Sequence, residues 1–391
     1  MKKSTYCILL ICAFSAVIGL GIISPFMPAF IEKHGANGFW IGMIFAGFGI
    51  SRAIIMPLVG RVSDKTGKKV FVSSGLLIFT IISLFYPLAR NVYEMTAIRL
   101  IHGLAAGLIM PIVMAYVGEI AEKGREGLRM GTLNMVFYIG LATGPFLGGI
   151  IGENYGFDAV FHLMGIIGAF TFFIVLFFLP DSKGVLVSDP AEWGFRALMR
   201  YNFVKAVLLS ALLITLTTAV FISFLPSLAT LVDVDPDHIG IIISIGIFLA
   251  GVLQVPFGRF SDRLDRAGKF IQIGSGTTIG MTALFAMPFC PGFDALLVAG
   301  SLVGLGAAIA VPAISSLSVT IGHKAGMGAW MGIINTARSV GLAITPLLAG
   351  IFMDHWGVDT VFYLFGLLAL FGLLGLGYFV FKRFRMDIRR A

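Results

Sequence analysis

One short segment concentrates charge between two long apolar runs: Gly60-Arg61-Val62-Ser63-Asp64-Lys65-Thr66-Gly67-Lys68-Lys69. The glycine permits close approach of another helix, the aspartate can pair with a cation or a helix N-terminus, and the lysines can bind an anionic membrane leaflet. At an offset of 198, Gly258, Ser261 and Asp262 repeat the pattern, with Asp265 and Arg266 inserted after it. We predict two related loops with a shared role, made by Gly60, Asp64, Lys65, Gly67 and Lys68 and by Gly258, Asp262 and Arg263.

Three arginines, Arg52, Arg99 and Arg338, lie inside apolar runs. An arginine within a membrane is costly and usually faces a cavity or a partner. Because guanidinium binds carboxylate and phosphate in a bidentate manner, these residues favour an anionic or zwitterionic solute over a lipophilic cation. Alternatively, each arginine bonds backbone carbonyls or loop acids and fixes helix ends. Our candidates for a polar substrate cavity are Arg52, Asn134, Gln254, Asn335 and Arg338.

All 20 Asp and Glu fall in loops or at the ends of apolar runs. A proton carrier needs a group that titrates near the working pH. The candidates are therefore His102, within an apolar run, and the carboxylates Asp64 and Glu119. Asp64 lies in the first loop, and Glu119 lies at the end of an apolar run on the same side as that loop. His102 alternatively packs between helices through an internal hydrogen bond.

Enzyme and metal motifs are absent from the sequence. It contains no H-E-x-x-H, no G-x-S-x-G, no P-loop and no C-x-x-C spacing. We therefore expect no catalytic residues, no cofactor and no bound metal, and we do not expect ATP to drive the protein.

The elements that carry these residues are apolar. Hydrophobic residues make up 58% of the 391 residues and charged ones 12%, with a mean hydropathy of +0.97. A soluble domain has about twice that charged fraction. Runs of about 20 apolar residues, enough to cross the hydrocarbon layer, predict twelve membrane helices. They cover approximately 6–31, 39–59, 70–89, 93–118, 128–152, 158–180, 203–230, 238–258, 270–289, 293–320, 327–353 and 358–381.

Charge sets the expected orientation. With alternating helices and a cytoplasmic N-terminus, all but five of the 28 Lys and Arg face the cytoplasm; the exceptions are Lys33, Arg52, Arg90, Arg99 and Arg338. This bias predicts a multi-pass protein of the cell (plasma or inner) membrane with both termini cytoplasmic. It also explains the net charge of +8 without a nucleic-acid partner. The N-terminal run is too long for a signal peptide and is expected to remain as the first helix.

The second half of the chain repeats the first. At an offset of 201, matches include Gly103 with Gly304, Asn134 with Asn335 and Pro145 with Pro346. The repeat unit is six helices, so both copies have the same orientation, as in transporters built from two parallel bundles. We predict an all-α integral membrane fold, with bundles at 1–180 and 203–391 and a cytoplasmic linker at 181–202. The linker is either a short surface helix or a disordered tether.

The first loop resembles the G-x-x-x-D-R/K-x-G-R/K-R/K signature of the major facilitator superfamily. Arg99 and Gly103 resemble the family's R-x-x-x-G motif, whose arginine is associated with proton coupling, although His102 stands where glutamine is usual. Residues 140–149 match G-x-x-x-G-P-x-x-G-G, typical of the family's antiporters, through Gly140, Gly144, Pro145, Gly148 and Gly149. The likeness spans nearly the whole chain and is greatest to the twelve-helix drug/proton antiporters.

This resemblance implies alternating access around a central site, with the two related loops as gating loops and with Arg99 and His102 as coupling or transport candidates. We expect a monomeric secondary transporter in the lipid bilayer, which exports a small organic solute in exchange for protons. The alternatives are an exporter or facilitator of an anionic metabolite without proton coupling, or a non-transporting receptor on the same fold. The antiporters of this family often keep a carboxylate in the first helix, and this chain has none there.

Overall fold

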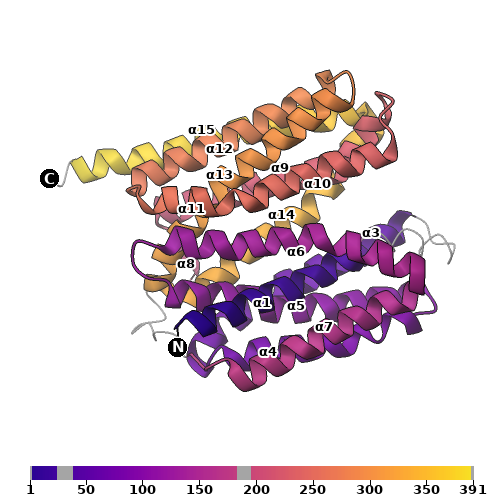
Figure 1. Cartoon of the computed structure of the whole chain (residues 1–391). Helices are drawn as coiled ribbons and strands as arrows, with labels where there is room; N and C mark the ends of the chain where they lie inside the picture. The colour runs from indigo at the N-terminus through magenta and orange to yellow at the C-terminus, as the bar shows by residue number, and fades with distance from the viewer. Residues whose placement is uncertain (1, 24–37, 183–194, 389–391) are drawn as a thin grey trace. The chain divides into compact units, whose positions relative to one another are not determined.

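A computed structural model describes residues 2–23, 38–182 and 195–388. The described residues are helical with no strand, which confirms the all-α prediction. Twelve long helices appear in them when α10 and α11 are counted as one helix broken at Leu253 (Figure 1). They are α1 (Lys2–Ile23), α3 (Gly38–Thr66), α4 (Lys69–Ser83), α5 (Val92–Ile120), α6 (Glu126–Tyr155), α7 (Phe157–Phe178), α9 (Asn202–Thr230), α10 (Pro236–Val252), α11 (Gln254–Asp262), α12 (Arg266–Ala286), α13 (Phe293–Ala325), α14 (Met327–Trp356) and α15 (Val358–Ile388).

Several helices extend beyond the predicted apolar runs. The charged loop segment at 60–66 is helical and forms the last two turns of α3. Nine helical stretches in the described residues are long and apolar enough to cross a membrane. Of the predicted linker at 181–202, residues 183–194 lie outside the described part. The short helix α8 (Phe195–Leu198) precedes α9.

The chain folds into two compact units. Unit 1 comprises residues 1–121, 136–186 and 322–340, and unit 2 comprises 122–135, 187–321 and 341–391. Each unit therefore contains most of one repeat together with a helix segment from the other. The first part of α6 belongs to unit 2, and the first part of α14 belongs to unit 1.

Glycines set the closest helix contacts in unit 1. Here α5 packs against α3, α4 and α1, and α7 packs against α4 and α1. A side chain at Gly103 of α5 would overlap the carbonyl oxygen of Phe48 in α3, and one at Gly75 of α4 would meet the Ile109 side chain. Small residues let helix backbones approach closely, which is the main source of packing energy between helices in lipid.

Unit 2 repeats this arrangement. Here α9 packs against α10, α12 and α15, and α12 also packs against α15. Gly304, the repeat counterpart of Gly103, lies against the carbonyl of Gly246 in α10. Gly276, the counterpart of Gly75, lies against Gly306 of α13. The glycines matched between the two halves of the sequence thus occupy matched helix contacts.

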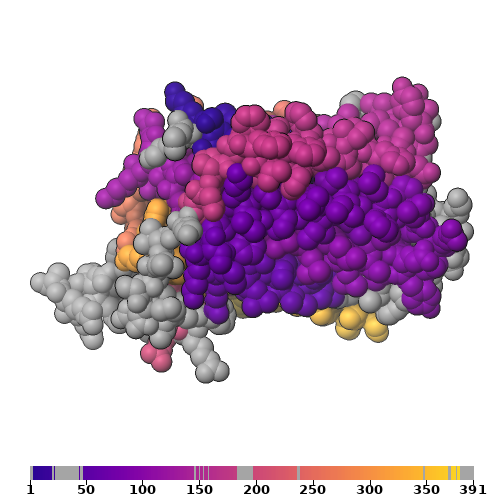
Figure 2. Space-filling model, turned by 90° about the horizontal axis from the view of Figure 1, so that it is seen from below, coloured from indigo at the N-terminus to yellow at the C-terminus, as the bar shows by residue number. Residues whose placement is uncertain are grey.

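The outer face of α7 is apolar. Ile166, Phe170, Phe173 and Phe177 are exposed and spaced so that they share one side of the helix. Figure 2 shows this face of the molecule, which α7 shares with α4. The repeat counterparts on α15 are also exposed: Leu367, Phe371, Leu374 and Tyr378. Such continuous apolar stripes are expected of helices that face lipid.

Candidate functional site

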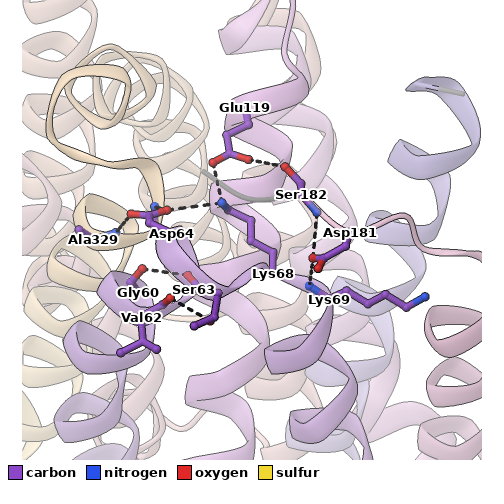
Figure 3. A network of polar contacts seen from close by, with 12 residues as sticks. Gly60, Val62, Ser63, Asp64, Lys68, Lys69, Glu119, Asp181, Ser182 and Ala329 are labelled. Atoms are coloured by element: carbon purple, nitrogen blue, oxygen red, sulfur yellow. Dashed lines mark hydrogen bonds and ion pairs between the residues drawn. The ribbon is translucent and has the colours of Figure 1, made fainter. Parts of the chain in front are cut away.

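Asp64 lies at the N-terminal end of α14, within unit 1. Its Oδ1 accepts a hydrogen bond from the backbone N–H of Gly328 at 2.9 Å, and its Oδ2 accepts one from Ala329 at 3.0 Å (Figure 3). The first amides of a helix have no partner within the helix, and the helix dipole favours negative charge there. The carboxylate therefore satisfies two free donors. Of the two partners expected for Asp64, a cation or a helix N-terminus, this contact is the helix N-terminus.

Gly60 brings the two backbones together one turn earlier. A side chain there would overlap the carbonyl oxygen of Gly328. The Ser63 hydroxyl donates to the Gly60 carbonyl at 2.8 Å and lies on the same side of the helix turn. Because only glycine fits this crossing, Gly60 determines how close Asp64 comes to its helix N-terminus.

Lys68 connects this contact to α5. Its side chain is fully buried, and its Nζ lies 3.4 Å from Oδ1 of Asp64 and 2.6 Å from Oε1 of Glu119 (Figure 3). The other oxygen of Glu119 accepts a hydrogen bond from the Ser182 hydroxyl at 3.0 Å. One buried ammonium thus holds two carboxylates, from α3 and from the end of α5.

The residues after α7 complete the network. Oδ1 of Asp181 accepts from the backbone N–H of Lys69 at 3.2 Å, and the backbone N–H of Lys68 donates to the Ser182 carbonyl at 3.2 Å. Gly67 turns the chain with a φ of +106° beside the Asp181 carboxylate, where a side chain would be both strained and obstructed. Asp181 and Ser182 were not among the predicted site residues, and no sequence signal links them to a loop more than a hundred positions earlier.

The second loop repeats the acid contact in unit 2. Asp262 accepts from the backbone N–H groups of Gly127 at 2.6 Å and Leu128 at 2.9 Å, at the start of α6. Gly258 lies against the Gly127 carbonyl, as Gly60 lies against that of Gly328. The structure therefore brings together the predicted Gly and Asp of each loop with a helix N-terminus.

Among the residues that the structure describes, the ion pairs of the first loop have no copy in the second. Lys269, the counterpart of Lys68, donates to the Ser316 hydroxyl at 2.7 Å, and Thr320 stands in the position of Glu119. Lys65 and Arg263 are exposed and form no ion pair within the described residues. Among the candidate loop residues, only Asp64 and Lys68 thus belong to a buried charge network.

Arg99 is buried between α5 and α3. Its Nε donates to the Ile44 carbonyl at 3.4 Å, and its guanidinium lies 5.0 Å from the centre of the Phe48 ring. The carbonyl bond and the cation–π contact join the two helices. The bond to the Ile44 carbonyl is the kind of contact expected of the alternative in which the arginines bond backbone carbonyls.

His102 lies one turn further along α5 and is fully buried. Its Nδ1 is 2.8 Å from the Tyr86 hydroxyl, and the rings of Phe48, Phe79 and Tyr86 meet it edge-on. This is the environment expected of the packing alternative. The coupling role of His102 stays a prediction.

The five cavity candidates separate into three places. Arg52 and Arg338 lie in unit 1, near enough for their charges to interact, and Tyr138 is within electrostatic reach of Arg338. In unit 2, Nδ2 of Asn134 donates to Gln254 at 3.4 Å and to Ser315 at 3.2 Å. The third place belongs to Asn335, whose Nδ2 donates to Sδ of Met114 and to the Met331 carbonyl. Tyr138 and Ser315 were not predicted, because nothing in their local sequence distinguishes them.

The G-x-x-x-G-P-x-x-G-G segment lies in the unit 1 part of α6. Gly140 packs against the backbone and ring of Phe14 in α1, and Gly144 and Gly148 are buried. The side chain of Pro145 and the surroundings of Gly149 lie outside the described part. In unit 2, the counterpart Gly341 packs against Leu212 and Thr215 of α9. The motif therefore provides a packing surface for the first helix of each repeat.

The whole chain also matches a known family. The sequence profile described as Major Facilitator Superfamily covers residues 9–205 and 207–388. This chain belongs to the Major Facilitator Superfamily. It is accordingly a multi-pass membrane transporter with the major facilitator fold, and it is not an enzyme.

Individual relatives are similar over nearly their full length. An uncharacterized MFS-type transporter of Methanocaldococcus jannaschii is 25% identical over 93% of this chain and 94% of its own. The quinolone resistance protein NorA of Staphylococcus aureus is 25% identical over 87% of this chain and 88% of its own. The human organic anion transporter MFSD10 (TETRAN) has the same fold, with a TM-score of 0.81, 18% identity, and coverage of 96% and 99% of the two chains.

Proposed function

We propose that this transporter exports a small organic solute in exchange for protons, by alternating access between two six-helix bundles. The observation that carries the proposal is the paired contact of Asp64 with the start of α14 and of Asp262 with the start of α6. In each pair, a loop of one repeat holds a helix of the other repeat. A bundle that rocks must release such contacts when the cytoplasmic side opens and remake them when it closes.

The chemistry of these contacts suits repeated release. An exposed carboxylate and exposed helix amides both bind water, so the net free energy of each hydrogen bond is small compared with its strength in isolation. Lys68 and Glu119 add a charge-assisted ion pair at the first loop, and the second loop has no equivalent within the described residues. We therefore expect the contact of the first loop with α14 to be more stable than the contact of the second loop with α6.

Export and proton exchange are supported by similarity. Residues 140–149 match the motif typical of antiporters, and the NorA relatives are described as quinolone resistance proteins. Protons would be carried by carboxylates at the helix ends or by His102, since each carboxylate within the described helices lies about one turn or less from a helix end.

A second candidate is export or facilitated passage of an anion without proton exchange. Arg52 and Arg338 favour it, because they place two cations near one another in unit 1 and neither forms an ion pair with a carboxylate of the described residues. The solved structure with the same fold is described as an organic anion transporter.

Flux in proteoliposomes tests the proposal. Purified protein is reconstituted with a pH-sensitive dye, a pH gradient is imposed, and pools of anionic metabolites or cationic drugs are added. Solute-dependent proton movement that is lost in Asp64→Asn supports the exchanger. Solute movement without proton movement supports the second candidate and removes the first. If neither pool moves protons or solute, while a reconstituted antiporter control does, the export proposal is withdrawn for both classes of solute.

A further inference from the structure

Helix α3 and the first part of α14 meet in a regular series of contacts within unit 1. The hydroxyl of Thr336 donates to the Ala53 carbonyl at 3.2 Å, and a side chain at Gly332 would meet the Met56 carbonyl. The antiparallel contacts advance by three or four residues on each helix, in the order Gly60–Gly328, Met56–Gly332 and Ala53–Thr336. Such a register brings the next residues of both helices to the same level.

Arg52 directly precedes Ala53 on α3, and Arg338 lies two positions after Thr336 on α14. The two arginines therefore lie close to the same contact, and their charges are near enough to repel. Nε of Arg52 is buried and has no hydrogen-bond partner. Neither arginine forms an ion pair with any carboxylate in the described residues. In contrast, Arg99 bonds a backbone carbonyl.

The second repeat shows that this helix crossing does not require arginine. Gly127–Gly258 and Gly131–Gln254 form the equivalent contacts in unit 2. The sequence counterparts of Arg52 and Arg338 are Ala250 and Phe137, both apolar. Two half-buried cations close together lower stability unless something neutralises them. Their presence in one repeat only therefore indicates a ligand rather than a packing role.

We infer that Arg52 and Arg338 together bind the anionic group, a carboxylate, sulfonate or phosphate, of the transported solute. Two guanidinium groups present several N–H donors to an oxyanion in a planar arrangement, and the anion supplies the charge that the protein lacks. Tyr138, within electrostatic reach of Arg338, adds a hydroxyl to the same site. The inference deepens the proposed transport function, because it names the class of solute.

Binding without transport provides the test. The full chain, purified in detergent, is melted with and without inorganic sulfate at constant ionic strength, for the wild type and for Arg52→Gln and Arg338→Gln. Sulfate also stabilises proteins by exclusion from their surface, so the quantity measured is the difference between variants. The matched control is Arg90→Gln, which removes an exposed arginine.

Two results are expected. Without sulfate, Arg52→Gln and Arg338→Gln each melt at a higher temperature than the wild type, because the repulsion between the two arginines is relieved. Sulfate then raises the wild-type and Arg90→Gln melting temperatures by several degrees more than those of the site variants. Benzoate is then compared with benzamide, which is neutral, and with benzylammonium, which is a cation. If benzoate raises the melting temperature more than sulfate does, the organic group contributes to binding as well as the oxyanion.

Other outcomes overturn the inference. A lower melting temperature of both site variants without ligand would show that the arginines are structural. An equal sulfate shift in wild type and variants, or a larger shift with benzylammonium than with benzoate, would exclude an anion site. Neither readout requires flux, so failure here leaves the proposed transport intact, and failure of transport leaves the anion site intact.

Discussion

Asp64 precedes Gly328 by more than 250 positions, yet its Oδ1 accepts the Gly328 backbone N–H at 2.9 Å. The acid stands on α3 of the first repeat, and the amide opens α14 of the second. This hydrogen bond ties the two halves of the sequence into one compact unit.

Asp64→Asn is expected to weaken the α14 contact by about 2 kcal/mol, because the amide has no negative charge and only one acceptor oxygen for the two N–H donors. Solute flux should fall, and the melting temperature should fall with it. The matched change is Asp262→Asn, which weakens the same contact in the second repeat but removes no ion pair with a buried lysine. If Asp262→Asn lowers both the flux and the melting temperature more than Asp64→Asn does, the contact of the first loop is not the more stable one.

Lys68→Met should destabilise the protein by about 3–5 kcal/mol, because it leaves Glu119 and Asp64 without their buried cation. Thermal unfolding in detergent measures the change, with Lys65→Met as the exposed control.

The double change Lys68→Met with Glu119→Gln should recover part of the Lys68 loss, because it removes the unpaired charge together with its partner. Strictly additive effects of the two changes on thermal unfolding would show that Lys68 and Glu119 do not interact in the folded protein.

Gly60→Ala and Gly258→Ala should each lower the melting temperature and the yield of folded protein. A methyl group at either position overlaps a carbonyl oxygen of the neighbouring helix, and overpacking costs about 1–3 kcal/mol or more. Gly274→Ala is the control, since nothing lies within 4 Å of a side chain there. The control variant should be as stable as the wild type or more so, because alanine favours helix. A neutral Gly60→Ala would mean that α3 and α14 are not in close contact.

Arg99→Ala should abolish proton-coupled flux, and Arg99→Lys should restore only part of it. Lysine keeps the charge but lacks the planar group that bonds Ile44 and stacks over Phe48. Arg90→Ala, a change at an exposed residue just before the same helix, should leave flux unchanged. Full coupled flux in Arg99→Ala, measured by the dye assay, would leave Arg99 only a role in packing.

His102→Gln separates the two roles of the histidine. Glutamine can keep the hydrogen bond to Tyr86 but cannot carry a proton. If His102 only packs, solute flux and proton flux both persist in this variant. Solute flux with no proton flux would instead assign the coupling role to His102.

The sequence by itself determined which segments are helical and how the chain repeats. Hydropathy predicted twelve spans because backbone N–H and C=O groups in lipid can bond only to one another, which requires an apolar helix. This constraint acts on each segment locally. The matched glycines and aspartates marked the contact sites because close helix approach and helix N-termini require those residue types. These requirements for glycine and aspartate can be recognised in the sequence without knowing which helix each residue contacts.

Only the tertiary structure decided which helix each residue meets. The sequence shows that Asp64 needs a cation or a helix N-terminus, and the fold supplies α14, together with the buried Lys68 and Glu119 pair. It likewise shows that Arg52 and Arg338 are costly in a membrane, and the register of α3 on α14 brings them together. Such pairings join residues hundreds of positions apart. They depend on packing of the complete unit, which no local pattern of residues encodes.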